Sequence, residues 1–311
     1  MKKYLGIDIG GTNTKLGIVT EDGRLIEKVK YSTLQLRENK DYPSAFTEVL
    51  KTFLNDHQDL EPYIGIGVPG TISKDRKSTI DLPNIPSLGH TNLVDILEQS
   101  LPDKKFLLEN DASAAALGEL HFSGADLPDD FIFLTLGTGI GGAVIVNREI
   151  FKGGEGNAME VGHMFAGSKK TVEELIGKKG IVDEAQKLMG KKKRSSPGLY
   201  DLENLTAKDV VKAALNGDKI GEKVFRKFGK VLGRCIVSTV RVLDIHHIIL
   251  GGGVADTFEL IKPSMFEVIN KNLPPYYTHD LKVELASLAN EAGIMGAAAL
   301  GFAREIELHL V

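Results

Sequence analysis

Short apolar runs, separated by glycines and turn residues, fill the first part of the chain. Residues 3–9, 15–20 and 26–32 are runs of this kind, and a glycine pair, Gly10-Gly11, separates the first from the second. Such runs predict β-strands, and turns this tight predict strands that pair as a meander. Residues 42–57 place apolar side chains at helical spacing and predict a helix. The chain therefore opens as an α/β unit.

The same alternation continues and then repeats from the beginning. Residues 64–70 and 104–110 predict strands, and residues 92–101 and 112–122 predict helices. At residue 131 the opening layout of strand, glycine-rich turn, strand, turn and strand begins again. A repeated layout of this kind indicates two domains built from one unit.

Later parts of the chain complete the second domain. The segments with helical spacing are residues 171–190, 206–216 and 218–243. A length of 311 residues also suggests about two domains. We therefore expect an N-terminal α/β domain over residues 1–115 and a larger C-terminal α/β domain over residues 116–290. The last helix, at about 291–311, is expected to pack back on the first domain.

Composition narrows the class of protein. Apolar residues make up 42% and charged residues 26% of the chain, which is the balance of a soluble globular protein. The formal net charge of −4 argues against broad attraction to nucleic acid or to an anionic membrane. The basic run at residues 191–196 is the one local exception, and we interpret it as a solvated loop.

The single cysteine, Cys235, excludes a disulfide or a cysteine-based zinc knuckle within one chain. Its neighbours have helical apolar spacing, so we expect a buried, inert thiol. The apolar stretch at the N-terminus is too short for a signal sequence, and no stretch approaches ~18 uninterrupted apolar residues, the length of a membrane span. We therefore expect a cytoplasmic protein.

Three glycine-rich turns follow predicted strands, at Gly10-Gly11, 137–142 and 251–253. Glycine at a strand end lets the backbone approach a ligand and present bare N–H groups, although each turn alone is equally consistent with an ordinary hairpin. Residues 137–142 match the dinucleotide pattern G-x-G-x-x-G, but a strand, not a helix, is predicted directly after them. A Rossmann site needs that helix, so we reject it. No P-loop pattern occurs in the chain either.

These turns predict a phosphate clamp made of two β-hairpins. The first hairpin offers Thr12, Asn13 and Thr14, with Lys15 as a cation, and the second offers Thr138. Asp8 ends the first strand, where a carboxylate is poorly tolerated unless it has a role. Coordination of Mg²⁺, directly or through water, would explain Asp8, and a turn-capping aspartate is the alternative.

Seven segments occur in the order that marks a known family. They are GIDIGGTNTKLGI, GVPG, LPNI, LENDASAAALGE, LGTGIGG, EVGH and LGGGV. From Asp8 to about Gly253 the chain resembles the ROK family of sugar kinases, which belongs to the actin-like ATPase-domain superfamily. The resemblance implies an α/β fold of two actin-like ATPase (ribonuclease H-like) domains, with ATP and sugar meeting in the cleft between them.

The resemblance also implies the roles of individual residues. ATP and Mg²⁺ would be held by the glycine turns, at Asp8, Gly10, Gly11, Thr12, Asn13, Lys15, Thr138, Gly139, Gly252 and Gly253. The sugar would be bound by Gly70, Asn84, Asn110, Asp111, Glu160, His163 and Glu173. Asp111 takes the place of the catalytic base, which the chemistry needs because a sugar hydroxyl is a poor nucleophile.

The residues by themselves leave other readings open. Asp111 and Asn110 lie where a strand ends and a helix begins, which is also where a capping residue belongs. Asn84 could make an Asx-turn in a loop, and Glu160 and Glu173 could be solvated surface residues. We interpret two other acidic residues, Glu109 and Glu119, as structural.

The chain departs from the family pattern after the EVGH segment. Many members have three cysteines there that bind a structural zinc with the histidine, whereas this chain has MFAGSKKTVEEL. We therefore expect no structural zinc and a loop ordered by side-chain packing and by the sugar. The shorter loop also leaves Glu174 as a rival to Glu173. Met159 stands where a glycine usually precedes the glutamate, and it could alter which hexose fits.

The resulting hypothesis is an ATP-dependent hexose kinase that acts on glucose, with a homodimer expected. N-acetylmannosamine, N-acetylglucosamine and fructose are the alternative substrates, and a non-catalytic sugar sensor is an alternative of another class. Repressors of the same family carry an N-terminal winged-helix domain. Because the first strand is predicted to start at Lys3, we expect no such domain and no nucleic-acid partner.

Overall fold

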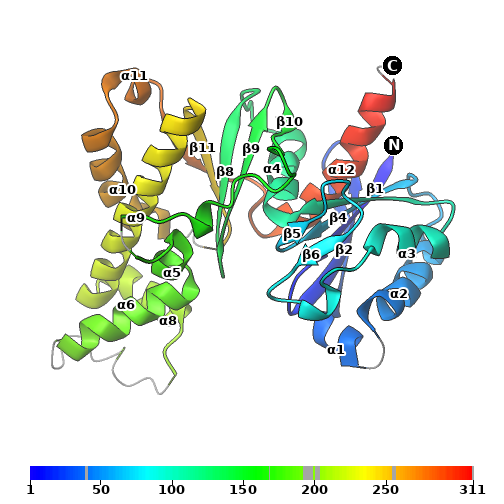
Figure 1. Cartoon of the computed structure of the whole chain (residues 1–311), viewed down its shortest axis with the longest axis horizontal. Coiled ribbons are helices and arrows are strands. Elements are labelled where there is room, and N and C mark those ends of the chain that lie inside the picture. The colour runs from blue at the N-terminus through cyan, green and yellow to red at the C-terminus, as the bar shows by residue number, and fades with distance from the viewer. Residues whose placement is uncertain (39–40, 168, 192–198, 200–203, 254–256, 310–311) are drawn as a thin grey trace. The chain divides into compact units, whose positions relative to one another are not determined.

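The computed structural model describes residues 1–38, 41–167, 169–191, 199, 204–253 and 257–309 (Figure 1). The chain forms two compact units. The first consists of residues 1–129, 143–158 and 286–311, and the second of residues 130–142 and 159–285. The boundary expected between residues 115 and 116 falls inside a helix, Asp111–Phe122, that lies wholly in the first unit. Most of the basic run at 191–196 lies outside the described residues.

A five-stranded sheet with the order β3-β2-β1-β4-β7 forms the centre of the first unit. Its strands are β1 (Lys3–Ile9), β2 (Asn13–Thr20), β3 (Leu25–Ser32), β4 (Tyr63–Val68) and β7 (Lys105–Asn110). The first three strands pair antiparallel, as the tight turns predict, and β4 and β7 run parallel to β1. The carboxyl ends of β1, β4 and β7 therefore lie at one edge of the sheet.

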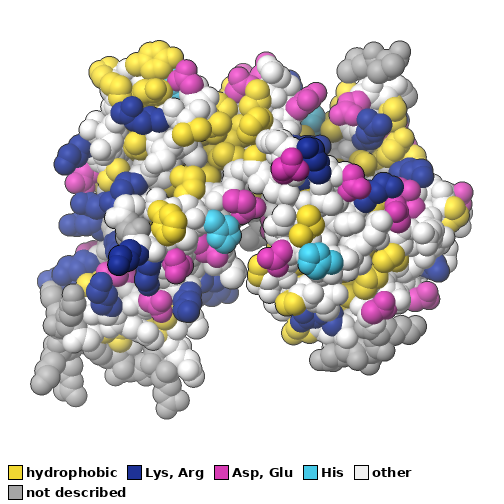
Figure 2. Space-filling model, in the orientation of Figure 1, with side chains coloured by type: hydrophobic (Ala, Val, Ile, Leu, Met, Phe, Trp, Pro, Cys, Tyr) yellow, Lys and Arg dark blue, Asp and Glu magenta, His cyan; other side chains and the backbone are white. Residues whose placement is uncertain are grey.

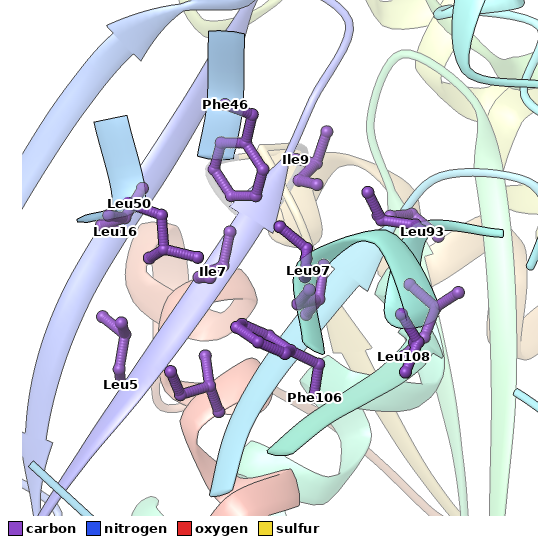
Figure 3. Packing of buried hydrophobic residues seen from close by; sticks show 14 of the residues in the cluster. Leu5, Ile7, Ile9, Leu16, Phe46, Leu50, Leu93, Leu97, Phe106 and Leu108 are labelled. Atoms are coloured by element: carbon purple, nitrogen blue, oxygen red, sulfur yellow. The ribbon is translucent and has the colours of Figure 1, made fainter. Parts of the chain in front are cut away.

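Helices cover both faces of this sheet. They are α1 (Thr33–Glu38), α2 (Tyr42–Asp56), α3 (Leu93–Ser100), α4 (Asp111–Phe122) and α12 (Ala292–His309). Alternate residues of β1 point to opposite faces. Figure 3 shows Leu5, Ile7 and Ile9 packed with Phe46 of α2 and with other apolar residues of α2, α3 and β7. Apolar side chains thus fill the space between this face of the sheet and the helices that cover it.

On the opposite face, α12 approaches the sheet at glycines. A Cβ atom on Gly6 of β1 would lie 2.1 Å from the carbonyl oxygen of Ile294, and one on Gly65 of β4 would lie 1.8 Å from that of Ala297. Close approach of this kind requires residues without a side chain. The last helix thus belongs to the first unit.

A second sheet with the order β10-β9-β8-β11-β12 repeats the first. Its strands are β8 (Phe131–Leu136), β9 (Ile140–Val146), β10 (Glu149–Ile150), β11 (His247–Gly251) and β12 (Lys282–Leu285). Here too an antiparallel hairpin, β9-β10, precedes strands that run parallel to β8. The repeated layout read from the sequence, and the α/β fold class, are confirmed.

The second unit also holds the short helix η2 (Val161–His163) and a group of α-helices. These are α5 (Val172–Ile176), α6 (Lys178–Lys191), α8 (Ala207–Leu215), α9 (Lys219–Leu243), α10 (Phe258–Asn272) and α11 (Pro275–Thr278). Cys235 on α9 is only 2% exposed, and burial raises the pKa of its thiol to about 12, as expected for an inert cysteine. None of the described helices combines the length and apolar character needed to cross a bilayer.

The first unit is completed by a small hairpin, β5 (Thr71–Ile72) and β6 (Thr79–Asp81), and by the short helices η1 (Pro86–Leu88) and η4 (Ala289–Glu291). The hairpin begins directly after Gly70 and ends three residues before Asn84. It therefore joins two segments to which the resemblance assigns sugar binding. Figure 2 shows side chains of both charge signs on the displayed face, in keeping with the small net charge.

Candidate active site

The candidate residues of the first unit gather at the carboxyl edge of its parallel strands. The turn after β1 is closed by the Gly10 N–H, which donates to the carbonyl of Asn13 at 2.9 Å. A Cβ atom on Gly11 would lie 2.9 Å from Cβ of Asn84, so only glycine fits there. The turn after β1 and the loop with Asn84 are therefore in direct contact.

Asp8 and Lys15 form an ion pair across β1 and β2, with 2.6 Å between Oδ2 and Nζ. The Asp8 side chain is 18% exposed. It faces the N-terminal end of α12, since a Cβ atom on Gly293 would lie 2.8 Å from the Asp8 carboxylate. Asp8 therefore lies in a strand next to a cation, and not in the turn-capping position that we considered as the alternative.

The hydroxyl groups of the first turn divide into exposed and buried ones. Thr12 is exposed. Thr14 is fully buried and shares hydrogen bonds with the hydroxyls of Thr33 and Tyr42, at 2.9 and 2.8 Å. The Thr33 hydroxyl in turn donates to the carbonyl of Gly10 at 2.7 Å. Thr14 thus holds the turn in place through buried hydrogen bonds, and its hydroxyl is not exposed to a ligand, in contrast to the prediction from the sequence.

Asn110 and Asp111 make different hydrogen bonds at the start of α4. The Asn110 side-chain oxygen accepts from the N–H groups of Ala112 and Ser113, and its amide donates to the carbonyl of Gly70 at 3.1 Å. Of the two residues that the sequence offers as caps, Asn110 is therefore the N-cap of the helix. Asp111 is the first helical residue, and its Oδ1 accepts from Ala112 at 2.8 Å. A carboxylate is favoured at this end of a helix by the helix dipole.

The glycine turn of the second unit follows β8. The Gly137 N–H donates to the carbonyl of Gly139 at 2.9 Å, and β9 begins with the next residue. No helix follows the turn, which confirms that this is not a Rossmann site. Gly252 has a φ of +88°, and a Cβ atom there would lie 2.5 Å from the carbonyl oxygen of Leu136. At Gly253, no atom of the described residues lies within 4 Å of an added Cβ atom.

A lysine that we did not consider also reaches this turn. Lys178, at the start of α6, donates from Nζ to the Thr138 hydroxyl at 2.8 Å. Its ammonium group therefore places a positive charge beside the turn. The sequence gives no local signal for this contact, because Lys178 is 40 residues from Thr138.

The structure distinguishes the two rival glutamates. Glu173 accepts from the N–H of Ile140 at 2.9 Å, and a Cβ atom on Gly139 would lie 2.3 Å from its Oε2. Glu174 instead forms a capping box with Thr171 at the start of α5. Only Glu173 is directed at the glycine turn.

The segment that precedes α5 is closed by backbone contacts. Phe165 and Thr171 form an antiparallel bridge, and the Val172 N–H donates to the carbonyl of Met164 at 2.8 Å. Val172 itself is fully buried. Among the described residues, no group of three or more His, Cys, Asp or Glu side chains is placed to hold a metal ion. The two ends of the loop are thus joined by backbone hydrogen bonds next to a buried residue of α5.

Glu160 lies directly before η2 and His163 is its last residue. The Glu160 carboxylate and the His163 ring nitrogen are 3.9 Å apart. Their side chains are 48% and 70% exposed, so both are accessible to a ligand. Met159, directly before them, has a φ of +71°, in the left-handed region that favours glycine. This chain therefore has a methionine at a position whose backbone conformation favours glycine.

Comparison with known proteins places the chain in a family. The ROK family model matches residues 4–304. The chain belongs to the ROK family. It is 30% identical to a glucokinase of Thermotoga maritima over 96% of both chains, and 27% identical to an N-acetylmannosamine kinase of Yersinia pestis over 96% of this chain and 98% of the relative.

Solved structures agree with this assignment. A ROK family glucokinase from Streptomyces griseus, in complex with glucose and AMPPNP, is 28% identical and covers 97% of this chain and 99% of its own, with a TM-score of 0.79. The resemblance to ROK sugar kinases, and the actin-like ATPase fold that it implied, are confirmed.

Proposed function

We propose that the protein is an ATP-dependent hexose kinase that converts glucose to glucose 6-phosphate, with Asp111 as general base. The observation that carries the proposal is the position of Asp111 at the start of α4. Because Asn110 is the residue that caps the helix, the helix does not depend on the carboxylate of Asp111 for its cap. The Gly10 turn and Gly70 follow the neighbouring strands β1 and β4 at the same edge of the sheet.

In the proposed reaction, the Asp111 carboxylate accepts the proton of the sugar hydroxyl as the hydroxyl oxygen attacks the γ-phosphorus of ATP. A bond forms between that oxygen and phosphorus, and the bond from phosphorus to the β,γ-bridging oxygen breaks. ADP leaves with the bonding electrons. General-base catalysis of this kind contributes ~10²–10⁴-fold, and positioning and charge neutralisation supply the rest.

The proposed sugar contacts are Gly70, Asn84, Asn110, Glu160, His163 and Glu173, together with Asp111. Carboxylates and amides at fixed positions can accept from and donate to ring hydroxyls. Glu173 is preferred to Glu174, because the Glu174 carboxylate is used in the capping box of α5.

The proposed phosphate contacts are the two hairpin turns and Gly252-Gly253, which offer backbone N–H groups. Lys15 and Lys178 lie beside these turns and can neutralise phosphate charge. Asp8 fits a magnesium ion, because Mg²⁺ is commonly held by one or two carboxylates together with substrate phosphates and waters. When bound, the ion would offset negative charge on the phosphates, and Lys15 would exchange its contact with Asp8 for one with phosphate.

The choice of sugar rests on the relatives. The glucokinase of Thermotoga maritima is the relative that favours glucose, and the N-acetylmannosamine kinase of Yersinia pestis is the reason to test amino sugars with equal care. We further propose a cytoplasmic homodimer, in line with the frequency of two-fold assemblies.

ADP release from ATP and Mg²⁺, measured across a panel of hexoses and amino sugars, tests the proposal. Turnover with glucose is expected, and an absence of turnover with every sugar would favour a non-catalytic sensor. Asp111→Asn should lower kcat by about 10²–10⁴-fold and lower the thermal unfolding temperature by no more than a few degrees, the scale of a lost interaction with the helix dipole. Asp103→Asn, an exposed aspartate in the turn before β7, is the matched control and should keep full activity.

A further inference from the structure

The β5-β6 hairpin carries a charged side chain into the interior of the first unit. Nη1 of Arg76, in the turn of this hairpin, lies 3.1 Å from Oε1 of Glu109 on β7. The two side chains are 15% and 3% exposed. Removing two charges from water is costly, and this cost can exceed the attraction between them. A gain in stability is therefore not a sufficient explanation for the buried pair.

Glu109 is bonded to the backbone of the candidate active site. Its Oε1 accepts from the N–H of Asn110 at 2.8 Å, and Asp111 is the next residue. Burial raises the pKa of Glu109, and the nearby charges that oppose this rise are those of Arg76 and Lys152. Arg76 is thus the charged neighbour that most strongly opposes the effect of burial on the carboxylate, and the carboxylate accepts from the backbone where β7 ends and α4 begins.

Arg76 occupies its position at an energetic cost. Its φ is +59°, in the left-handed region that non-glycine residues rarely adopt. Nε and Nη1 are buried, and within the described part of the chain neither has an acceptor at hydrogen-bonding geometry. The contact with Glu109 is therefore held by charge and not by an aligned hydrogen bond. Strain of this kind is typical of functional sites.

The hairpin is also held at its first strand, β5, which contains Ile72. The Asn157 side chain donates to the carbonyl of Ile72 at 2.8 Å and accepts from the N–H of Ile72 at 3.0 Å. Asn157 lies three residues before Glu160 along the chain. The same small hairpin is thus continuous with Gly70, leads to Asn84, and contacts both Glu109 and Asn157.

We propose that the Arg76–Glu109 pair is a positioning device that fixes the backbone of Asn110 and Asp111, so that the base and the helix cap keep their places. This inference rests on the proposed kinase function. It assigns no contact with substrate to either residue. Its consequence is that the pair acts on the rate of the chemical step through the residues that follow Glu109.

The test uses Arg76→Met, Glu109→Gln, the double variant and Arg76→Lys. We expect each single neutral variant to lower kcat about 10- to 100-fold, the scale of a misplacement near 1 Å, with the KM for ATP unchanged. Arg76→Lys should recover part of kcat, because it restores the charge. The double variant should be no slower than the slower single variant, because the two residues act as one unit.

Lys74→Met is the matched control, since Lys74 lies in the same turn but pairs on the surface with Glu155, at 67% and 88% exposure. It should keep wild-type kcat. Thermal unfolding of every variant separates misplacement from loss of fold. The double variant leaves no unpaired buried charge, so it keeps the test valid if a single variant fails to fold.

Two results would overturn the inference in different ways. If wild type phosphorylates a sugar and the folded Arg76→Met, Glu109→Gln and double variants keep kcat within about twofold, the pair is merely structural and the proposed function stands. If wild type shows no turnover on any sugar, the proposed function fails and the inference fails with it.

Discussion

At the scale of single residues, Met159 is held in a conformation that its side chain disfavours. Its φ is +71°, and its carbonyl lies against Gly142, where a Cβ atom would come within 2.7 Å. A left-handed residue with a side chain costs roughly 1–2 kcal/mol. Because this residue is directly followed by Glu160, the strain lies beside a proposed sugar contact.

Met159→Gly should therefore raise the free energy of unfolding by about 1 kcal/mol, since glycine adopts this conformation without steric cost but gains entropy in the unfolded chain. Chemical denaturation measures the change. Met164→Gly is the control, because Met164 is in the same segment with a φ of −69°. Glycine there should lower stability. If both variants change stability in the same direction, strain at Met159 is not the cause.

At the scale of elements, two adjacent glutamates of helix α5 make different contacts. Glu174 completes a capping box with Thr171, the N-cap of the helix, and Glu173 reaches the Gly139 turn. Glu174→Ala should lower the free energy of unfolding slightly, because it removes one of the two hydrogen bonds of the capping box, and should keep kcat and KM. Glu173→Gln should raise the KM for the sugar with little effect on unfolding. Steady-state kinetics with thermal unfolding distinguishes them, and the reverse result would make Glu174 the sugar ligand.

The contact of α12 with the first sheet depends on glycines. A Cβ atom on Gly65 would overlap the Ala297 carbonyl, so Gly65→Ala should lower the free energy of unfolding by about 1–3 kcal/mol, the cost of overpacking. Gly154→Ala is the control, because no atom of the described part of the chain lies within 4 Å of the added Cβ there. Equal unfolding midpoints for the two variants would show that α12 can move away without cost.

Elements with a strong periodic signal could be predicted from the sequence, and short ones could not. Residues 3–9 were predicted as a strand and form β1, with the same bounds. The β5-β6 hairpin was missed, because strands of two and three residues carry no period. The same limit applies to the candidate site. The glycine turns can be recognised from a few neighbouring residues. The contacts of Arg76 and Lys178 join residues more than 30 positions apart, so no local pattern predicts them.

At the scale of the whole molecule, the repeat of one sheet in two places could be predicted, but the membership of each unit could not. The chain passes between the units after Asp129, Gly142, Ala158 and Leu285. The segment that follows Leu285 is held in the first unit by Glu119 of α4. The Glu119 carboxylate accepts from the N–H groups of Ser287 and Leu288 at 3.1 and 2.8 Å. The interpretation of Glu119 as structural fits this contact.

The response of the whole fold to pH is set in part by His121, which joins α4 to α12. Its ring packs edge-on against Phe302 at 5.3 Å. Burial, with a smaller effect of Arg148, lowers the pKa of His121 from 6.5 to about 4. Between these two values the unfolded chain binds the proton and the folded protein does not. This contribution to stability is therefore complete above pH 6.5 and is lost as pH falls towards 4.

The free energy of unfolding should then fall by up to about 1.4 kcal/mol for each pH unit between 6.5 and 4, in addition to the effects of other groups. His121→Phe keeps an aromatic ring against Phe302 and removes the titration, so its stability should fall less over this range. Urea unfolding of both proteins at several pH values gives the difference. The buried Glu109 and Glu119, whose pKa values burial raises, titrate in both proteins and cancel in the comparison. Parallel losses in the two proteins would show that His121 takes up its proton without opening the contact between α4 and α12.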